Sequence, residues 1–199
     1  MKQVKKCKNN NSYKELIGEF IKLNQITLHQ YGNDYEWRYQ YFCYRHLFDI
    51  RFLKMPKQNI NSVGECVLIE FERPLHLEFV IRNALDKLGN KWKYTIVCCE
   101  DNYEFIRSLD NNISTEFNII KVDTRDKNKL LKRKDFWNKL TGKKVLFYGN
   151  DSVFFVKEGI KNYFKWDFIC APIYDESNKN MILGGPSLSM RTKDIMLKV

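Results

Sequence analysis

Long apolar runs and the common cysteine motifs are missing from this sequence of 199 residues. No window approaches the roughly 18 uninterrupted apolar residues that a membrane-spanning helix needs, so we expect no membrane span. The basic start leads into no apolar segment, which argues against a secretory signal. The six cysteines include no CxxC pair, and their spacing fits neither a zinc ribbon nor a disulfide framework. We therefore expect reduced, mostly buried thiols in a cytoplasmic protein.

The motifs of several large enzyme classes are also absent. No GxGxxG motif follows the apolar run at residues 66–71, which argues against a dinucleotide-binding fold. The P-loop pattern GxxxxGK[ST] does not occur either. There is no GxSxG nucleophile elbow. The three histidines, at positions 29, 46 and 76, have neither metal-ligand nor triad spacing.

Positive charge is in excess, but it is mostly lysine. The chain has 34 Lys+Arg against 24 Asp+Glu, and residues 1–60 hold 11 basic and 5 acidic side chains. Lysine outnumbers arginine 25 to 9, whereas proteins that read bases or clamp phosphates rely more on arginine. A solvated lysine-rich surface is thus favoured over a nucleic-acid groove. A basic module that binds nucleic acid or an anionic surface remains the alternative, and a nucleotide-phosphate substrate is compatible with the charge.

The N-terminal part of the chain predicts helices. Residues 1–12 have the composition of a disordered polar tail, and residues 13–60 predict an N-terminal helical extension, with helices over 13–31 and 35–54. In the second helix one side is rich in apolar residues, which we expect to form the packing face. These residues are Trp37, Tyr41, Tyr44, Leu47, Phe48 and Phe52.

From residue 64 onward, strand and helix patterns alternate. Apolar β-rich runs predict strands over 66–71, 94–99, 117–122 and 144–148, and amphipathic runs predict helices over 75–88, 102–109 and 127–140. A buried segment over 166–173, a strand or loop over 183–191 and a last helix capped by Thr192 complete the prediction. The alternation predicts an α/β fold with a mostly parallel, Rossmann-like sheet and helices on both faces.

Parallel sheets bind ligands at the carboxyl ends of their strands, and polar residues follow several of the predicted strands. Asp151 comes directly after an apolar strand, where a carboxylate can bind a hard divalent cation that neutralises a diphosphate. Ser152 could orient that carboxylate or add an oxygen ligand. Residues 150–152 could equally form only a turn, since Asn and Asp favour turns. Residues 100–101 form a further polar cluster, in which we expect Asp101 to cap the following helix.

Two more clusters are candidates for ligand contacts. Glu70, at a strand end, can accept a hydrogen bond from a base or a ribose hydroxyl, and Arg73 can bind a phosphate. The alternative is an ion pair between these two side chains. Gly184 and Gly185 would let backbone N–H groups approach a ligand closely, with Ser187 as a polar contact. The alternative there is an ordinary loop.

Five segments agree in order with a known family. They read VLIEFERPLHLEFVIRNALDKLG, YTIVCCEDNYEFIRSL, FWNKLTGKKVLFYGNDSVFF, WDFICAPI and GGPSLSMRT. Over residues 64–199 the chain resembles a glycosyltransferase-like domain family of unknown function that occurs in large DNA viruses and some microbes. The preceding WRYQYFCYRHL segment is similar to the lead-in of viral members, which would place the protein in a host cytoplasm.

The resemblance implies a GT-A-type fold and a set of site residues. Asp151 would be the ligand of a divalent metal, Mn²⁺ in the first place and Mg²⁺ as the alternative. Asn150 and Ser152, on either side of it, would contact the nucleotide-sugar, and Glu70 and Arg73 would line the nucleotide pocket. Near the transferred sugar and the acceptor, the resemblance places Gly184, Gly185 and Ser187. It assigns no catalytic base.

The function implied is that of a metal-dependent glycosyltransferase of the hexosyltransferase type. It would move a sugar from a nucleotide-diphosphate donor to a hydroxyl of a protein or glycan. Two positions depart from the family pattern: Gly149 stands where a longer side chain is usual, and Leu183 stands where Asn is usual. The resemblance also implies a domain incomplete at its C-terminus, so a catalytically inactive, truncated remnant is an alternative.

Overall fold

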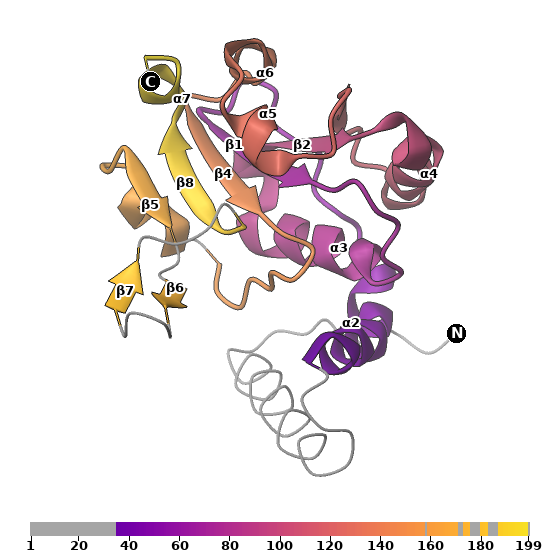
Figure 1. Ribbon diagram of the computed structural model, residues 1–199. Coiled ribbons are helices and arrows are strands. Elements are labelled where there is room, and N and C mark those ends of the chain that lie inside the picture. The colour runs from indigo at the N-terminus through magenta and orange to yellow at the C-terminus, as the bar shows by residue number, and fades with distance from the viewer. Residues whose placement is uncertain (1–34, 158, 171–172, 176–179, 183–186, 199) are drawn as a thin grey trace.

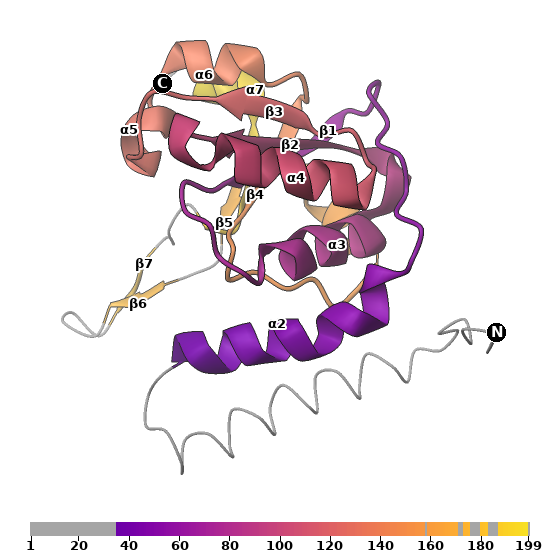
Figure 2. The same cartoon turned by 90° about the vertical axis from the view of Figure 1, so that its right-hand side faces the viewer.

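The computed structural model describes residues 35–157, 159–170, 173–175, 180–182 and 187–198. Figures 1 and 2 show an α/β arrangement in which helices lie on both sides of a central sheet. The expected tail over 1–12, the expected helix over 13–31, and Gly184 and Gly185 lie outside the described residues.

The sheet has six strands in the order β3-β2-β1-β4-β8-β5. Its parallel part consists of β1 (Gly64–Ile69), β2 (Trp92–Cys98), β3 (Asn118–Lys121) and β4 (Lys144–Tyr148). β8 (Ser189–Thr192) runs antiparallel to both β4 and β5 (Phe168–Cys170). A separate ribbon pairs β6 (Ile173–Asp175) with β7 (Asn180–Ile182). The mostly parallel sheet predicted from the sequence is therefore confirmed.

The helices connect the strands. α3 (Leu77–Leu88) and the short η1 (Gly89–Lys91) link β1 to β2, and η2 (Glu100–Asn102) with α4 (Tyr103–Ile113) links β2 to β3. α5 (Lys127–Leu131) and α6 (Lys134–Lys139) lie between β3 and β4, η3 (Gly159–Tyr163) precedes β5, and α7 (Lys193–Met196) follows β8.

The single helix predicted over 127–140 is in fact two short helices. Arg133 has an extended backbone conformation between them, and its guanidinium pairs with Asp123 at 2.5 Å and with Asp135 at 2.7 Å. The indole N–H of Trp137 donates to the Leu131 carbonyl at 2.7 Å, which satisfies an acceptor at the end of α5. Periodicity alone does not detect this break, because the apolar positions continue across it.

Alternation along the strands divides the core into two layers. Cys66 and Leu68 of β1 pack with residues of α3 and α4, whereas Val67 and Ile69 pack with residues of α5 and α6. All six residues of β1 are buried, as expected for a central strand covered on both faces. Helices on both faces are thereby confirmed.

α2 (Tyr35–Arg51) forms a further layer outside α3 (Figure 2). The packing face predicted for it was largely wrong, since Tyr44, Phe48 and Phe52 are 48%, 68% and 80% exposed. The buried face instead consists of Arg38, Tyr39, Phe42, Cys43 and His46. Aromatic side chains occur around most of this helix, so helical spacing did not identify the side that meets α3.

Two smaller predictions at the C-terminal end also need correction. The segment over 166–173 was expected to be buried, yet Phe168 of β5 is exposed, because β5 is the outermost strand of the sheet. Thr192 does stand at the N-cap position of α7, but it makes no capping hydrogen bond. Its hydroxyl donates to Asp167 at 2.8 Å instead.

Within the described part of the chain, no helix combines the length and apolar character needed to cross a membrane.

A buried carboxylate anchors the amino end of β1. Glu65 accepts hydrogen bonds from the Thr95 hydroxyl at 2.5 Å and from the N–H groups of Thr141 and Gly142 at 2.7 and 2.6 Å. A Cβ added at Gly142 would lie 2.4 Å from the Glu65 Cβ. A side chain at position 142 therefore cannot fit without displacing the strand.

We predict that Gly142→Ala lowers the free energy of unfolding by about 1–3 kcal/mol, because the new methyl group overpacks a buried site. The neighbouring exposed substitution Lys143→Ala serves as the control and should change stability by less than about 0.5 kcal/mol. Urea denaturation of both variants measures the difference. Equal stabilities of the two variants would contradict this account.

Candidate functional site

The strand order creates a switch point between β1 and β4. From β1 the chain passes to β2 and β3 on one side, and then crosses to β4 on the other side of β1. Leu68 pairs with Tyr148 in this register, so the residues that follow the two strands emerge next to each other. Ligand crevices of open α/β sheets lie at such points.

A cleft of about 560 Å³ lies at this end of the sheet. Its walls come from three places: helix α2, the loop after β1 (residues 70–76, the β1 loop) and the turn after β4 (residues 149–152, the β4 turn). The lining residues are Tyr39, Gln40, Glu72, Arg73, Pro74, His76, Asn150 and Asp151. Arg73, Asn150 and Asp151, all predicted from the sequence, are thus brought together.

The β4 turn exposes Asp151 to the cleft. The Ser152 N–H donates to the Gly149 carbonyl at 3.1 Å, and the Ser152 hydroxyl oxygen accepts from the Gly149 N–H at 3.0 Å. Residues 150–152 therefore do form a turn, and the turn presents an exposed carboxylate to the site. The turn that the sequence offered as one interpretation is therefore formed, and the cation-binding role of Asp151 stays a prediction.

Gly149 leaves room for the Asp151 carboxylate. A Cβ at position 149 would lie 2.4 Å from Asp151 Oδ1 and 3.6 Å from the Ser187 Cβ. The carboxylate thus occupies space that a side chain at position 149 would need. The same geometry places the exposed Ser187 beside the β4 turn.

Glu70 is buried at the end of β1 and shapes the β1 loop. Its Oε1 accepts from the N–H groups of Phe71 and Glu72 at 2.9 and 2.8 Å. Its Oε2 is also buried and has no hydrogen-bond partner in the described ranges. The ion pair with Arg73 offered as an alternative is not formed, because the Arg73 guanidinium donates to the Asp101 carbonyl.

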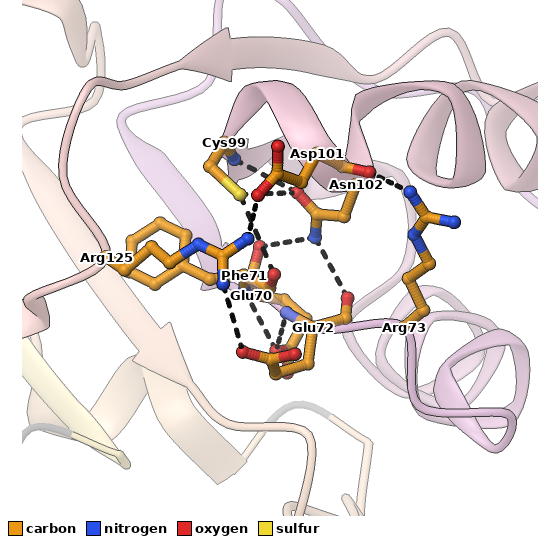
Figure 3. Close-up of polar contacts among 8 residues, drawn as sticks. All are labelled: Glu70, Phe71, Glu72, Arg73, Cys99, Asp101, Asn102 and Arg125. Carbon is orange, nitrogen blue, oxygen red and sulfur yellow. Dashed lines mark hydrogen bonds and ion pairs between the residues drawn. The ribbon is translucent and has the colours of Figure 1, made fainter.

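Asn102 joins the β1 loop to the end of β2 (Figure 3). Its Nδ2 donates to the carbonyls of Glu70 and Glu72, both at 2.9 Å, and its Oδ1 accepts from the Cys99 N–H at 3.0 Å. Sequence reasoning missed this residue and expected Asp101 to cap the helix instead. The N-cap position of α4 belongs to Asn102.

Asp101 faces a different partner. Its carboxylate binds Arg125, which follows β3 and also lies 4.0 Å from Glu72 Oε1 (Figure 3). The Asp101 charge raises the pKa of the Arg125 guanidinium. Together with Arg73, Arg125 places two cationic groups at this end of the sheet. No motif in the sequence indicated that Arg125 would lie at this site.

No group of three His, Cys, Asp or Glu side chains converges on a common point anywhere in the described ranges. A cation that binds together with a diphosphate needs fewer protein ligands, because phosphate oxygens and water complete its shell. The exposed carboxylate of Asp151 is a hard oxygen donor of the required kind. The donor chemistry therefore fits a shared cation, whereas no described cluster fits an all-protein metal site.

Comparisons with known proteins show which solved structures share this fold. The family described as "Protein of unknown function (DUF5672)" matches residues 111–199. No curated protein sequence matches the chain. Among solved structures, the mannosyltransferase PcManGT from Pyrobaculum calidifontis, in complex with GDP-Man and Mn²⁺, aligns with a TM-score of 0.52 and 13% identity. That alignment covers 94% of this chain and 56% of the mannosyltransferase chain.

Two further glycosyltransferase structures align less closely. TarS residues 1–349 from S. aureus gives a TM-score of 0.46 at 12% identity, over 68% of this chain and 48% of that one. The apo-form glycosyltransferase GlyE from Streptococcus pneumoniae TIGR4 gives 0.46 at 11% identity, over 68% and 35%.

The fold is thus GT-A-like, as the resemblance implied. This chain spans about 56% of the length of the mannosyltransferase it resembles.

We predict that Asn102→Ala destabilises the protein by about 2–3 kcal/mol, because it leaves several buried backbone groups without partners. Asn111→Ala, at an exposed position of α4, is the matched control and should cost less than about 1 kcal/mol. Thermal and urea unfolding would compare them. If Asn102→Ala were as stable as the control, Asn102 would not be the link between β1 and β2.

Proposed function

We propose that this protein is a glycosyltransferase that moves a sugar from a nucleotide-diphosphate donor to a hydroxyl acceptor, with a divalent cation. The observation that carries the proposal is the cleft at the β1–β4 switch point of a GT-A-like sheet, where Arg73 and Asp151 line the same space. The likeness to a mannosyltransferase structure that holds GDP-Man and Mn²⁺ supports it.

Asp151 is the residue that we assign to the cation, Mn²⁺ first and Mg²⁺ as the alternative. Its carboxylate is exposed to the cleft and makes no hydrogen bond or ion pair with any other described residue, so it is available to a ligand. A bound divalent cation supplies charge stabilisation to the leaving diphosphate. Arg73, in the same cleft, is the second positive group that we assign to the phosphates.

Glu70 is the residue that we assign to the nucleoside. Its buried Oε2 has a free acceptor site in the described part of the chain, and such an oxygen can accept a hydrogen bond from a base N–H or a ribose hydroxyl. The burial of the carboxylate makes a missing partner costly. A donor group from a ligand would remove that cost.

The remaining predicted residues surround the β4 turn. Asn150 lines the cleft, and Ser152, whose oxygen accepts from Gly149, still has a hydroxyl proton to donate. We assign both of them, with Ser187, to contacts with the donor. Gly184 and Gly185 keep the role near the sugar that the resemblance implies.

In the transfer, the acceptor oxygen would form a bond to the anomeric carbon as the bond from that carbon to the diphosphate breaks. The acceptor proton would leave to a base, and we assign no residue to that role. The electron pair of the broken bond goes to the diphosphate oxygen, where positive groups are needed most. Arg73 stands at the correct end of the sheet for that task.

We predict that Asp151→Asn lowers kcat/KM at least about 100-fold with Mn²⁺, because the amide keeps the size of the side chain and removes its charge. The control is Asp194→Asn, which changes an exposed acid of α7 beside the amino end of β4. A panel of UDP- and GDP-sugars, assayed for transfer and hydrolysis, provides the measurement. Equal loss of activity in both variants would argue against a role for Asp151.

Removal of divalent metal should abolish turnover, and added Mn²⁺ should restore it, with Mg²⁺ less effective. The check is the same assay after treatment with a chelator. Nucleotide binding without turnover would favour the inactive remnant. Salt-sensitive RNA binding that survives Asp151→Asn would favour the basic module instead.

A further inference from the structure

The β4 turn is anchored by two side chains that lie outside the sheet. His76, at the start of α3, places its Nε2 3.0 Å from the Asn150 carbonyl oxygen. The Tyr39 hydroxyl of α2 donates to the Ser152 carbonyl at 3.2 Å. These two carbonyls belong to the residues on either side of Asp151. Both anchoring side chains are buried.

The two anchors also contact each other. The rings of Tyr39 and His76 meet edge to face, with centroids 5.3 Å apart and planes at 85°. Such aromatic contacts are favourable and directional. The two anchors are therefore packed against each other.

A third contact fixes the segment that leaves the turn. Asn83 of α3 donates to the Phe154 carbonyl at 3.0 Å, and its Oδ1 accepts from the Phe154 N–H at 2.7 Å. The backbone around Asp151 is thus held at residues 150, 152 and 154 by side chains of α2, α3 and the residue before α3.

The Asp151 side chain itself has no such support, since its carboxylate makes no hydrogen bond or ion pair with the other described residues. The position of the carboxylate in the cleft is therefore set by the backbone of its neighbours. We propose that Tyr39 and His76 are positioning residues that hold Asp151 toward the ligand. In this proposal α2, which carries Tyr39, contributes to the geometry of the site. The proposal rests on the proposed function, in which Asp151 binds a cation.

The position of a ligand-binding carboxylate has a large effect on what it can do. A displacement of about 1 Å in a reacting or binding group can cost on the order of 100-fold in rate. A two-sided anchor on the backbone limits such displacement without using the carboxylate oxygens, which stay available.

The first test measures the turn itself and needs no ligand. Tyr39→Phe removes the hydroxyl that reaches Ser152, and hydrogen exchange of peptides covering residues 149–154 reports on the N–H groups of Gly149, Ser152 and Phe154. We expect exchange in this segment to rise about fivefold, while peptides from β1 and β2 remain unchanged. Unchanged exchange in residues 149–154 would overturn the proposal.

The matched control is Tyr94→Phe. The Tyr94 hydroxyl is also buried and also donates to a backbone carbonyl, that of Gly89, at 2.6 Å. The same chemical change is thus made away from the β4 turn. An equal rise in exchange at residues 149–154 in this control would show a general loss of stability and would overturn the proposal.

The second test measures how much Mn²⁺ strengthens the binding of GDP or UDP. We expect Tyr39→Phe to reduce this gain in affinity about fivefold, because a less firmly held Asp151 binds the cation less well. His76→Gln, which retains an N–H donor, should keep more of the Mn²⁺-dependent increase in nucleotide affinity than His76→Ala.

If Mn²⁺ increased the nucleotide affinity of Tyr39→Phe as much as that of the unaltered protein, the positioning role would be overturned. If the unaltered protein binds neither nucleotide, the proposed function fails, and the exchange experiment still decides whether Tyr39 anchors the turn.

Discussion

The pairing of β4 with β1, on the side opposite β2, is the constraint on which the rest of this structure depends. It places the last residues of two buried strands side by side. The polar residues that follow β1 and β4 therefore lie at the same end of the sheet, where they find water or hydrogen-bond partners, because burial without partners is costly. Glu70 and Asp151, 81 positions apart in the sequence, thereby lie at the same end of the sheet, Glu70 buried and Asp151 exposed.

Polar side chains buried close to that end keep the arrangement rigid. Asn102 uses both ends of its amide to tie the β1 loop to Cys99, and Glu70 binds two backbone N–H groups of its own loop. Buried hydrogen bonds such as those of Asn102 and Glu70 Oε1 help to hold a single loop conformation. Asp151 contrasts with them, since its carboxylate is exposed and its backbone is held from outside the sheet.

Most of the sheet could be predicted, because its signals are local. β4 was predicted with the observed bounds, and the other three parallel strands were displaced by at most two residues at an end. The site was predicted only in part. Arg73, Asn150 and Asp151 meet in the cleft, but Tyr39, His76 and Asn102 went unnoticed. Their roles depend on contacts across 30 to 113 positions, and no spacing in a single sequence reveals these.

Hydrophobic periodicity and strand-end polarity by themselves determined the fold class and placed an acidic group where a cation could bind. Only the tertiary structure decided which side of α2 is buried, that residues 127–140 break into two helices, and that a tyrosine and a histidine contact the backbone carbonyls on either side of Asp151. The physical reason is that periodicity records whether a residue is buried, whereas the choice of partner depends on how separate elements pack.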